Sequence, residues 1–390
     1  MMSRRARSLL LVAACMAGTA CHAEPGRAPV AGAGMPGTSP HLVPASKMPS
    51  PRAAHSATRL ADGRVLLAGG CAADGCEEGI ASDAILFDPV TGAFSPAGKL
   101  LQPRVGHRAI ALADGSVLLL GGYTPGGVTD IVERYVPGQG RFESHGRMLQ
   151  ARDGFSATLL ADGTILLAGG YADGMQRLTT AERYDSATGR SRDVGSMSSP
   201  RMSHTATLLR DGRVLLAGGS RASREVLTSL EVFDPAANRF IPAGKLSSAR
   251  HKHAAIALGG RVLVFGGASI PEDDGHFNDS EWWTPEGVTP GPRMAMGRYK
   301  FLDSLAMLDD GRVLVTGGGL RAEILDAKGS KFQSIDDAIG RRLAFTTATA
   351  LDDGRILVAG GYDPDIRVSQ NAWLVGHIAS DKNNITSDTD

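Results

Sequence analysis

One sequence pattern occurs seven times along the 390-residue chain and constrains its fold more than any other feature. Each copy holds an Arg, an apolar run, a Gly-containing turn, a second apolar run and a Gly-Gly pair; the clearest copy spans residues 201–219. The copies end at Gly70, Gly122, Gly170, Gly219, Gly267, Gly318 and Gly361, so they are spaced by 43 to 52 residues. A period of this length predicts one supersecondary unit per copy, stacked into a single array.

Each copy is expected to supply four β-strands. In the fourth copy these are residues 204–209, 213–217, 229–233 and 239–243. Asp211-Gly212 separates the first two strands and suits the positive φ angles of a type I′ hairpin turn. The run 213–217 is rich in apolar residues, as expected for a strand covered on both faces. No long stretch shows the helical period, so the expected fold class is all-β.

The pattern resembles the kelch repeat. The matching features are the Gly-Gly pairs, the turns Phe87-Asp88-Pro89 and Phe233-Asp234-Pro235, and aromatic residues in the fourth strand. These aromatic residues are Phe94, Phe142, Phe240 and Phe332; the family often has Trp there, and the third copy has Ser191 instead. The resemblance covers residues 41–376 and implies a seven-bladed β-propeller of four-stranded blades. It implies little about activity, because propellers host many functions.

The last blade is expected to be completed by the N-terminal strand. The seventh copy has three strand-like segments, ending near residues 370–375, and then turns polar. Residues 42–48 (LVPASKM) match residues 240–246 (FIPAGKL) of the fourth copy in order and spacing. Pairing of these segments would close the ring and leave no open edge at the junction.

The segments outside the propeller indicate export. Residues 1–21 combine Arg4, Arg5 and Arg7 with a short apolar run, as in a lipoprotein-type signal peptide. Cys21 or Cys15 is the predicted lipidation site; cleavage after Ala23 is the alternative. Residues 22–40 are expected to be a flexible linker and residues 377–390 a disordered tail. The expected location is the outer membrane as a lipoprotein facing the periplasm or the cell surface, and otherwise the periplasm or the medium.

Composition limits the classes of binding partner that are expected. The formal net charge is zero and the sequence has no basic stripe, so nucleic acid is not expected as a partner. Contact with a membrane is expected only through the lipid anchor. Cys71 and Cys76 lie in one loop with four residues between them and are expected to form a disulfide in an exported protein. We expect a monomer.

One face of the disc is the expected working surface. The loops after the second strand differ from copy to copy and share their face with the loops after the fourth strand, whereas the turns on the other face are short and repetitive. Recognition usually resides on variable loops held by a rigid scaffold. In the fifth-copy loop Asp273, Asp274, His276 and Asp279 lack the spacing of an EF-hand, so solvated charge is favoured over calcium.

A ring of residues recurs next to the first strand of each copy, at the expected mouth of the central channel. The ring arginines are Arg52, Arg104, Arg152, Arg201, Arg250, Arg298 and Arg342, and three residues later come His55, His107, Phe155, His204, His253, Phe301 and Phe345. Pairing candidates are Glu133, Glu182, Glu231, Glu281 and Glu323. Because the feature recurs in every unit, structural Arg–Glu pairs and satisfied histidines are the favoured interpretation. The alternative is an anion site, since Arg suits carboxylate and sulfate groups.

Two further interpretations concern this mouth. Tyr123, Tyr171 and Tyr362 follow Gly-Gly directly and either pack between blades or offer a stacking surface for sugar. The four histidines come from four different blades, so their convergence on one metal ion is not expected. No metal or other cofactor is predicted.

The favoured function is a non-catalytic binding module of the bacterial cell envelope, with an envelope protein or a glycan as ligand. The alternative is a sugar-converting enzyme similar to kelch-type sialic-acid epimerases, in which an Arg–carboxylate contact and a Glu or His base act on the anomeric centre. A copper radical oxidase similar to galactose oxidase is ranked lowest. That family needs a Tyr crosslinked to a Cys, another Tyr and two His, and here Cys71 and Cys76 are expected to pair with each other.

Overall fold

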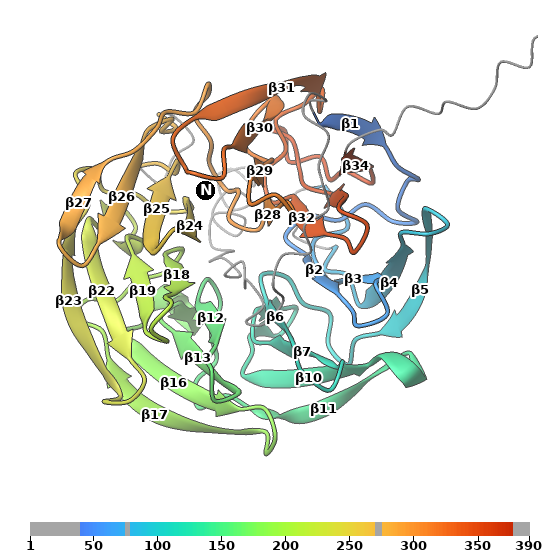
Figure 1. The fold of residues 1–390 in the computed structure, drawn as a ribbon. Helices are drawn as coiled ribbons and strands as arrows, with labels where there is room; N and C mark the ends of the chain where they lie inside the picture. The colour runs from blue at the N-terminus through green and yellow to red at the C-terminus, as the bar shows by residue number, and fades with distance from the viewer. Residues whose placement is uncertain (1–39, 75–78, 270–274, 377–390) are drawn as a thin grey trace, which may run out of the picture.

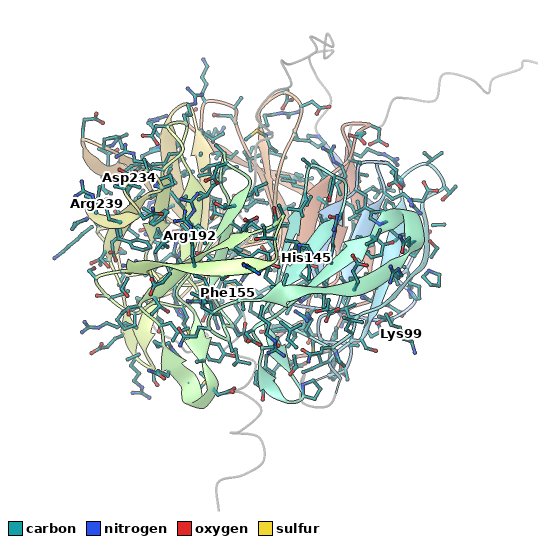
Figure 2. All side chains as sticks on the ribbon, turned by 90° about the horizontal axis from the view of Figure 1, so that it is seen from below. Lys99, His145, Phe155, Arg192, Asp234 and Arg239 are labelled. Carbon is teal, nitrogen blue, oxygen red and sulfur yellow. The ribbon has the colours of Figure 1, made fainter. Side chains whose placement is uncertain are left out.

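The computed structural model describes residues 40–74, 79–269 and 275–376, which form a seven-bladed β-propeller. Seven four-stranded antiparallel sheets are arranged around a central axis in chain order (Figure 1). This confirms the expected fold class. Figure 2 shows the disc from the side, with His145 and Arg192 labelled on the outer strands of blades 2 and 3.

Each blade runs from an inner strand at the axis to an outer strand at the rim. Blade 1 contains β2 (Ser56–Arg59), β3 (Val65–Ala68), β4 (Asp83–Asp88) and β5 (Ala93–Lys99); blade 2 contains β6 (Arg108–Ala111), β7 (Val117–Leu120), β10 (Ile131–Val136) and β11 (Arg141–Arg147). Blade 3 contains β12 (Ser156–Leu159), β13 (Thr164–Ala168), β16 (Thr180–Asp185) and β17 (Arg190–Ser196); blade 4 contains β18 (Thr205–Leu208), β19 (Val214–Ala217), β22 (Ser229–Asp234) and β23 (Arg239–Lys245).

The remaining blades have the same order. Blade 5 contains β24 (Ala254–Leu258), β25 (Arg261–Phe265), β26 (Ser280–Thr284) and β27 (Gly287–Pro290); blade 6 contains β28 (Leu305–Met307), β29 (Val313–Val315), β30 (Arg321–Leu325) and β31 (Phe332–Ala338). Blade 7 contains β32 (Thr347–Ala350), β33 (Ile356–Ala359), β34 (Ala372–Gly376) and β1 (His41–Pro44).

Small hairpins and turns lie between these strands. The hairpins are β8 (Tyr123–Thr124) with β9 (Gly127–Val128), β14 (Tyr171–Ala172) with β15 (Gln176–Arg177), and β20 (Ser220–Ala222) with β21 (Glu225–Val226). Two 3₁₀ turns, η1 (Pro137–Gln139) and η2 (Asp173–Met175), complete the described elements. Each hairpin follows a Gly-Gly pair, on the face of the variable loops.

The core lies between neighbouring blades. Every residue of β3, β7, β19 and β33 is buried, as the apolar runs before Gly-Gly predict. One cluster joins Leu66 and Leu86 of blade 1 to Leu119 and Tyr135 of blade 2. The Gly-Gly pair lets blades approach closely: Gly218 has φ +59°, and a Cβ placed there would lie 2.4 Å from the carbonyl oxygen of Arg250 in the next blade.

The N-terminal strand closes the ring, as predicted. β1 pairs antiparallel with β34 in a register that runs from His41 opposite Gly376 to Pro44 opposite Trp373. In Figure 1 the blue β1 lies beside the red β34. The Met48 N–H donates to Gln370 O at 2.9 Å, and Leu246 N–H donates to Thr228 O at 2.8 Å, so Met48 and Leu246 are equivalent.

Several predictions about the chain ends and cysteines lie outside the described residues. These concern Cys15, Cys21, residues 1–21, nearly all of the linker and the tail 377–390. Cys71 is buried in blade 1, but Cys76 also falls outside, so the disulfide stays a prediction. Among residues 40–74, 79–269 and 275–376, no helix has the length and apolar character needed to cross a membrane.

Candidate functional site

Except for Arg342, the ring arginines lie inside the blades with their guanidinium groups bonded. Six of them, Arg52, Arg104, Arg152, Arg201, Arg250 and Arg298, are at most 1% exposed. In blade 4, for example, Arg201 Nη2 lies 2.5 Å from Glu231 Oε1, and Arg201 Nη1 donates to Gly218 O at 2.9 Å. Burial lowers the pKa of Arg201, and the Glu231 carboxylate opposes this shift. The arrangement therefore holds a structural ion pair.

The same pairing recurs with small changes. The pairs are Arg104–Glu133, Arg152–Glu182, Arg201–Glu231, Arg250–Glu281 and Arg298–Glu323, while Arg52 pairs with Asp83. Each of the five glutamates also accepts a backbone N–H from the loop that enters its blade, as Glu231 does from Ser198 at 2.9 Å. The pairs thus anchor each incoming loop to the third strand of the blade.

Blade 7 departs from the sequence prediction at Arg342. Gly318 N–H donates to Leu343 O, whereas Gly219 N–H donates to Arg250 O, so Leu343 holds the ring position. Leu343 is 3% exposed, and Arg342 is exposed at the surface. Counted from Leu343, Thr346 therefore occupies the position that the histidines hold in the other blades. Phe345, which was predicted at that position, lies one residue before it. The predicted membership of Arg342 was wrong because the seventh copy carries an apolar substitute one residue later.

The predicted histidines join each blade to the preceding one. His55, His107, His204 and His253 are fully or nearly buried, and each places Nε2 within 2.9 to 3.1 Å of a Ser or Thr hydroxyl in the preceding blade. Burial lowers the pKa of His55 to about 3 and depresses the pKa of the other three well below the ordinary value. Their contacts lie between the blades and do not bring them together as a metal site.

A second ring, here called the collar, lies two residues after each of the six buried ring arginines and two residues after Leu343. Its members are Ala54, Gly106, Gly154, Ser203, Lys252, Lys300 and Phe345, and all have left-handed φ angles of 49° to 69°. In six of the seven blades, all except blade 3, the backbone N–H of the collar residue donates to the carbonyl of its equivalent in the preceding blade, as Lys300 does to Lys252 at 3.1 Å and Phe345 to Lys300 at 2.8 Å. The fold therefore demands a backbone conformation here, and no particular side chain.

The collar and its neighbours become polar in blades 5 and 6. We call His251, Lys252, His276, Tyr299 and Lys300 the axial cluster. Tyr299 Oη lies 3.3 Å from His251 Nε2, and the His276 ring stacks on the Tyr299 ring with centroids 5.1 Å apart. The ammonium groups of Lys252 and Lys300 lie 5.4 and 5.3 Å from the centroid of the same ring. Two imidazoles, a phenol and two ammonium groups therefore meet next to the innermost strands.

The predicted tyrosines have three different environments. Tyr362 borders the axial cluster, since its ring lies 5.6 Å from Lys300 Nζ and 5.4 Å from the Phe345 ring. Tyr171 donates from its hydroxyl to Asp153 Oδ2 at 2.6 Å, and Asp153 is fully buried. Tyr123 is half-buried and pairs in the β8–β9 hairpin. Only Tyr362 is brought to the axial cluster.

A polar contact also joins blades 2 and 6. Arg108 on β6 is 1% exposed and donates from Nε to Phe155 O at 3.0 Å. Its Nη1 lies 3.6 Å from Oδ2 of Asp303, which precedes β28. Among the described residues no group of three or more His, Cys, Asp or Glu side chains is placed to hold a metal ion.

Sequence reasoning missed most of the axial cluster. The signal was present between the Arg and His positions, where the copies read Ala-Ala, Val-Gly, Asp-Gly, Met-Ser, His-Lys and Tyr-Lys. The residues that every copy shares are those of the structural ring, and these were the predicted site. The residues that differ between copies include His251-Lys252 and Tyr299-Lys300, and they mark the axial cluster.

Comparison with known proteins adds a solved structure of similar fold. The protein is similar to a fungal alcohol oxidase of the AA5 family determined in complex with copper, with a TM-score of 0.69 and 17% identity over 86% of this chain and 76% of that one. No protein-family model and no curated protein sequence matches the chain. At this identity the similarity establishes the shared propeller fold.

This similarity corrects the functional expectation. The sequence analysis favoured a non-catalytic binding module, but the similar structure is that of an enzyme. The interpretation as a non-catalytic binding module was therefore wrong. That expectation rested on the lack of contiguous catalytic motifs in the sequence, and such a lack does not exclude an enzyme.

Proposed function

We propose that this protein is an enzyme that converts a hydroxyl-bearing substrate, a sugar, by acid–base chemistry at the axial cluster. The observation that carries the proposal is the contact between Tyr299 Oη and His251 Nε2 at 3.3 Å, beside two ammonium groups. A phenol and an imidazole in contact are groups that take up and release protons. They occur where the repeats diverge, so the fold alone does not account for them.

The proposed reaction is exchange of the anomeric configuration. One member of the Tyr299–His251 pair removes the proton of the anomeric hydroxyl, and the bond between C1 and the ring oxygen breaks. The ring oxygen takes up a proton, and closure on the other face of the carbonyl gives the second anomer. The pair shares one hydrogen bond whose direction depends on the tautomer of His251, so it could serve as acid in one direction and base in the other.

The side chains of the axial cluster can be compared with those that a copper site requires. His251, His276 and Tyr299 offer nitrogen and oxygen donors of the kind copper accepts. However, the His276 and Tyr299 rings stack at an interplanar angle of 23°, so their in-plane donor atoms do not point at a common centre. The one cysteine among the described residues, Cys71, lies in blade 1 and not at the axial cluster. These residues do not fit a copper radical centre, so no step uses copper.

Location remains part of the proposal. We place the enzyme outside the cytoplasm, because residues 1–21 have the charge and apolar pattern of an export signal. The kelch resemblance supports the repeat assignment, while the reaction is argued from the axial cluster alone.

The test is proton NMR of anomer exchange in a panel of sugars with the purified mature protein. We expect exchange well above the spontaneous rate and a loss of about 10²- to 10⁴-fold in Tyr299→Phe, because the phenol proton is removed without change of ring volume. Tyr135→Phe is the matched control, since the Tyr135 hydroxyl is buried in blade 2 without a hydrogen-bond partner and should be dispensable.

Two outcomes would overturn the proposal. Exchange that is unchanged in a folded Tyr299→Phe variant would remove the role of this pair. Equimolar copper in the purified protein, with oxidation of alcohols and release of hydrogen peroxide, would replace acid–base conversion by the oxidase alternative.

A further inference from the structure

Neighbouring blades meet near the axis through a recurring side-chain contact. A Ser or Thr that begins an inner strand bonds the histidine just before the inner strand of the next blade, as Thr205 bonds His253 at 2.9 Å. In two blades this contact is not possible, because Phe155 and Phe301 replace the histidine. Opposite Phe301 the preceding strand begins with Ala254, so a small apolar residue satisfies the fold at this position.

Opposite Phe155 the same position is occupied by Arg108, the first residue of β6. Arg108 is 1% exposed, and its Nε donates to Phe155 O at 3.0 Å. Burial of a cation costs free energy unless the cation is paired. Because alanine is sufficient at the equivalent position of blade 5, the guanidinium of Arg108 points to a use beyond the contact between blades 2 and 3.

Blade 6 differs from the other blades by two inserted residues, Leu302 and Asp303. In the other six blades the residue at the histidine position is followed directly by the inner strand, whereas here Leu302 and Asp303 separate Phe301 from Ser304. Ser304 still makes the recurring contact, since its hydroxyl lies 2.8 Å from the hydroxyl of Thr346 in blade 7. The insertion therefore preserves the contact between neighbours and adds a carboxylate.

These two departures from the repeat meet across the axis. Arg108 Nη1 lies 3.6 Å from Asp303 Oδ2, and the two side chains are 2% and 13% exposed. Figure 1 shows β6 and β28 on opposite sides of the axis. The backbone carbonyl of Asp303 also accepts the N–H of Ala348 in blade 7 at 2.8 Å. One ion pair therefore joins blades 2 and 6, and it reaches blades 3 and 7 through Phe155 O and Ala348 N.

We infer that Arg108 and Asp303 form a cross-axis brace, which holds opposite sides of the ring at a fixed separation and restrains residues 299–304 of blade 6. The histidine contacts and the collar hydrogen bonds join neighbouring blades, so they can follow a distortion of the whole ring. A contact between blades that are not neighbours opposes such a distortion. The brace is a property of the fold and does not depend on the proposed reaction.

The first test is a double-variant cycle of Arg108→Met and Asp303→Asn in the purified protein, measured by urea denaturation. Because both substitutions remove the same contact, the double variant should lose less stability than the two single variants together. We expect this coupling to change the unfolding equilibrium constant about tenfold or more. The control cycle is Arg147→Met and Asp130→Asn, an exposed ion pair within blade 2, for which a coupling of about fivefold or less is expected.

The second test is hydrogen exchange of backbone amides, followed by mass spectrometry. Asp303→Asn should accelerate exchange about tenfold or more in residues 299–307, and also in residues 105–111 on the opposite side of the axis. Arg147→Met should leave both segments unchanged. Additive effects in the cycle, or faster exchange on the blade 6 side alone, would overturn the brace. If Arg108→Met does not fold, the exchange measurement on Asp303→Asn decides between these outcomes.

Discussion

Buried ionisable side chains are confined to defined partners in this protein. Six of the ring arginines are at most 1% exposed and are bonded to carboxylates and to carbonyls of the Gly-Gly segments. The buried histidines are bonded to hydroxyls of the preceding blade. Removal of one partner leaves the other buried, which is the costly case. Two predictions follow at this scale from the pairs in blade 4.

The first concerns the Arg201–Glu231 pair. Arg201→Leu should lower the free energy of unfolding by about 3–5 kcal/mol, because Glu231, 2% exposed, is left buried without its counter-charge. The double variant Arg201→Leu/Glu231→Leu should recover much of this loss. Blade 7 provides the precedent, since Leu343 takes the Arg position and Trp373 takes the Glu position in one apolar cluster. Urea denaturation measures both; a double variant no more stable than the single one would contradict the explanation.

The second prediction concerns the pH dependence of the free energy of unfolding. The pKa of each buried histidine is lower in the folded protein than in the unfolded chain, mainly through burial. The unfolded chain therefore binds more protons below about pH 6.5, and stability falls as the pH is lowered from there toward 3, the pKa of His55. Each histidine contributes up to about a tenfold change in the unfolding equilibrium per pH unit.

The test of this second prediction is His204→Phe, since Phe155 and Phe301 occupy the same position in blades 3 and 6. The plot of unfolding free energy against pH between 6 and 4 should be less steep in the variant by about one proton's contribution. An unchanged slope would show that His204 is protonated in the folded state.

At the scale of elements, the join between β1 and β34 holds the ring closed. Leu42 on β1 is 8% exposed and belongs to the cluster between blades 6 and 7, whereas Val43 is 42% exposed. Leu42→Asp should therefore destabilise the protein by about 2–5 kcal/mol, because it buries a charge and removes an apolar side chain from the core.

Val43→Asp on the same strand is the control and should change stability by less than about 1 kcal/mol. Thermal unfolding of the two variants gives the comparison. Equal effects of the two substitutions would mean that β1 does not use its Leu42 face in solution.

At the scale of the whole molecule, the collar links the blades through backbone hydrogen bonds around the axis. Gly106→Ala should lower the free energy of unfolding by about 1–2 kcal/mol, because Gly106 has φ +69°, where a Cβ is unfavourable. Gly138→Ala, at an exposed glycine with no atom within 4 Å of the added Cβ, should be close to neutral. Chemical denaturation measures the free energy of unfolding of the two variants. An unchanged value in Gly106→Ala would show that the collar tolerates distortion.

The repeat arrangement explains which parts of the site were predictable. A local sequence pattern that is repeated seven times specifies the strands, the turns and the number of blades, because the strands of every copy must bury the same faces. The Arg–Glu pairing was predictable for a related reason: in blades 2 to 6 an Arg precedes the first strand and a Glu lies near the start of the third strand. The axial cluster recurs nowhere, so periodicity carried no information about it.

Sequence alone determined the all-β propeller, its seven units and the use of residues near Leu42 to complete the last blade. The tertiary structure decided that Leu343 replaces Arg342, that the arginines turn into the blades, and that Tyr299, His251 and the two lysines meet. The physical reason is that side-chain direction at the axis depends on the left-handed collar and on pairing between blades about fifty residues apart. The sequence of a single repeat does not determine this geometry, because it depends on contacts between repeats.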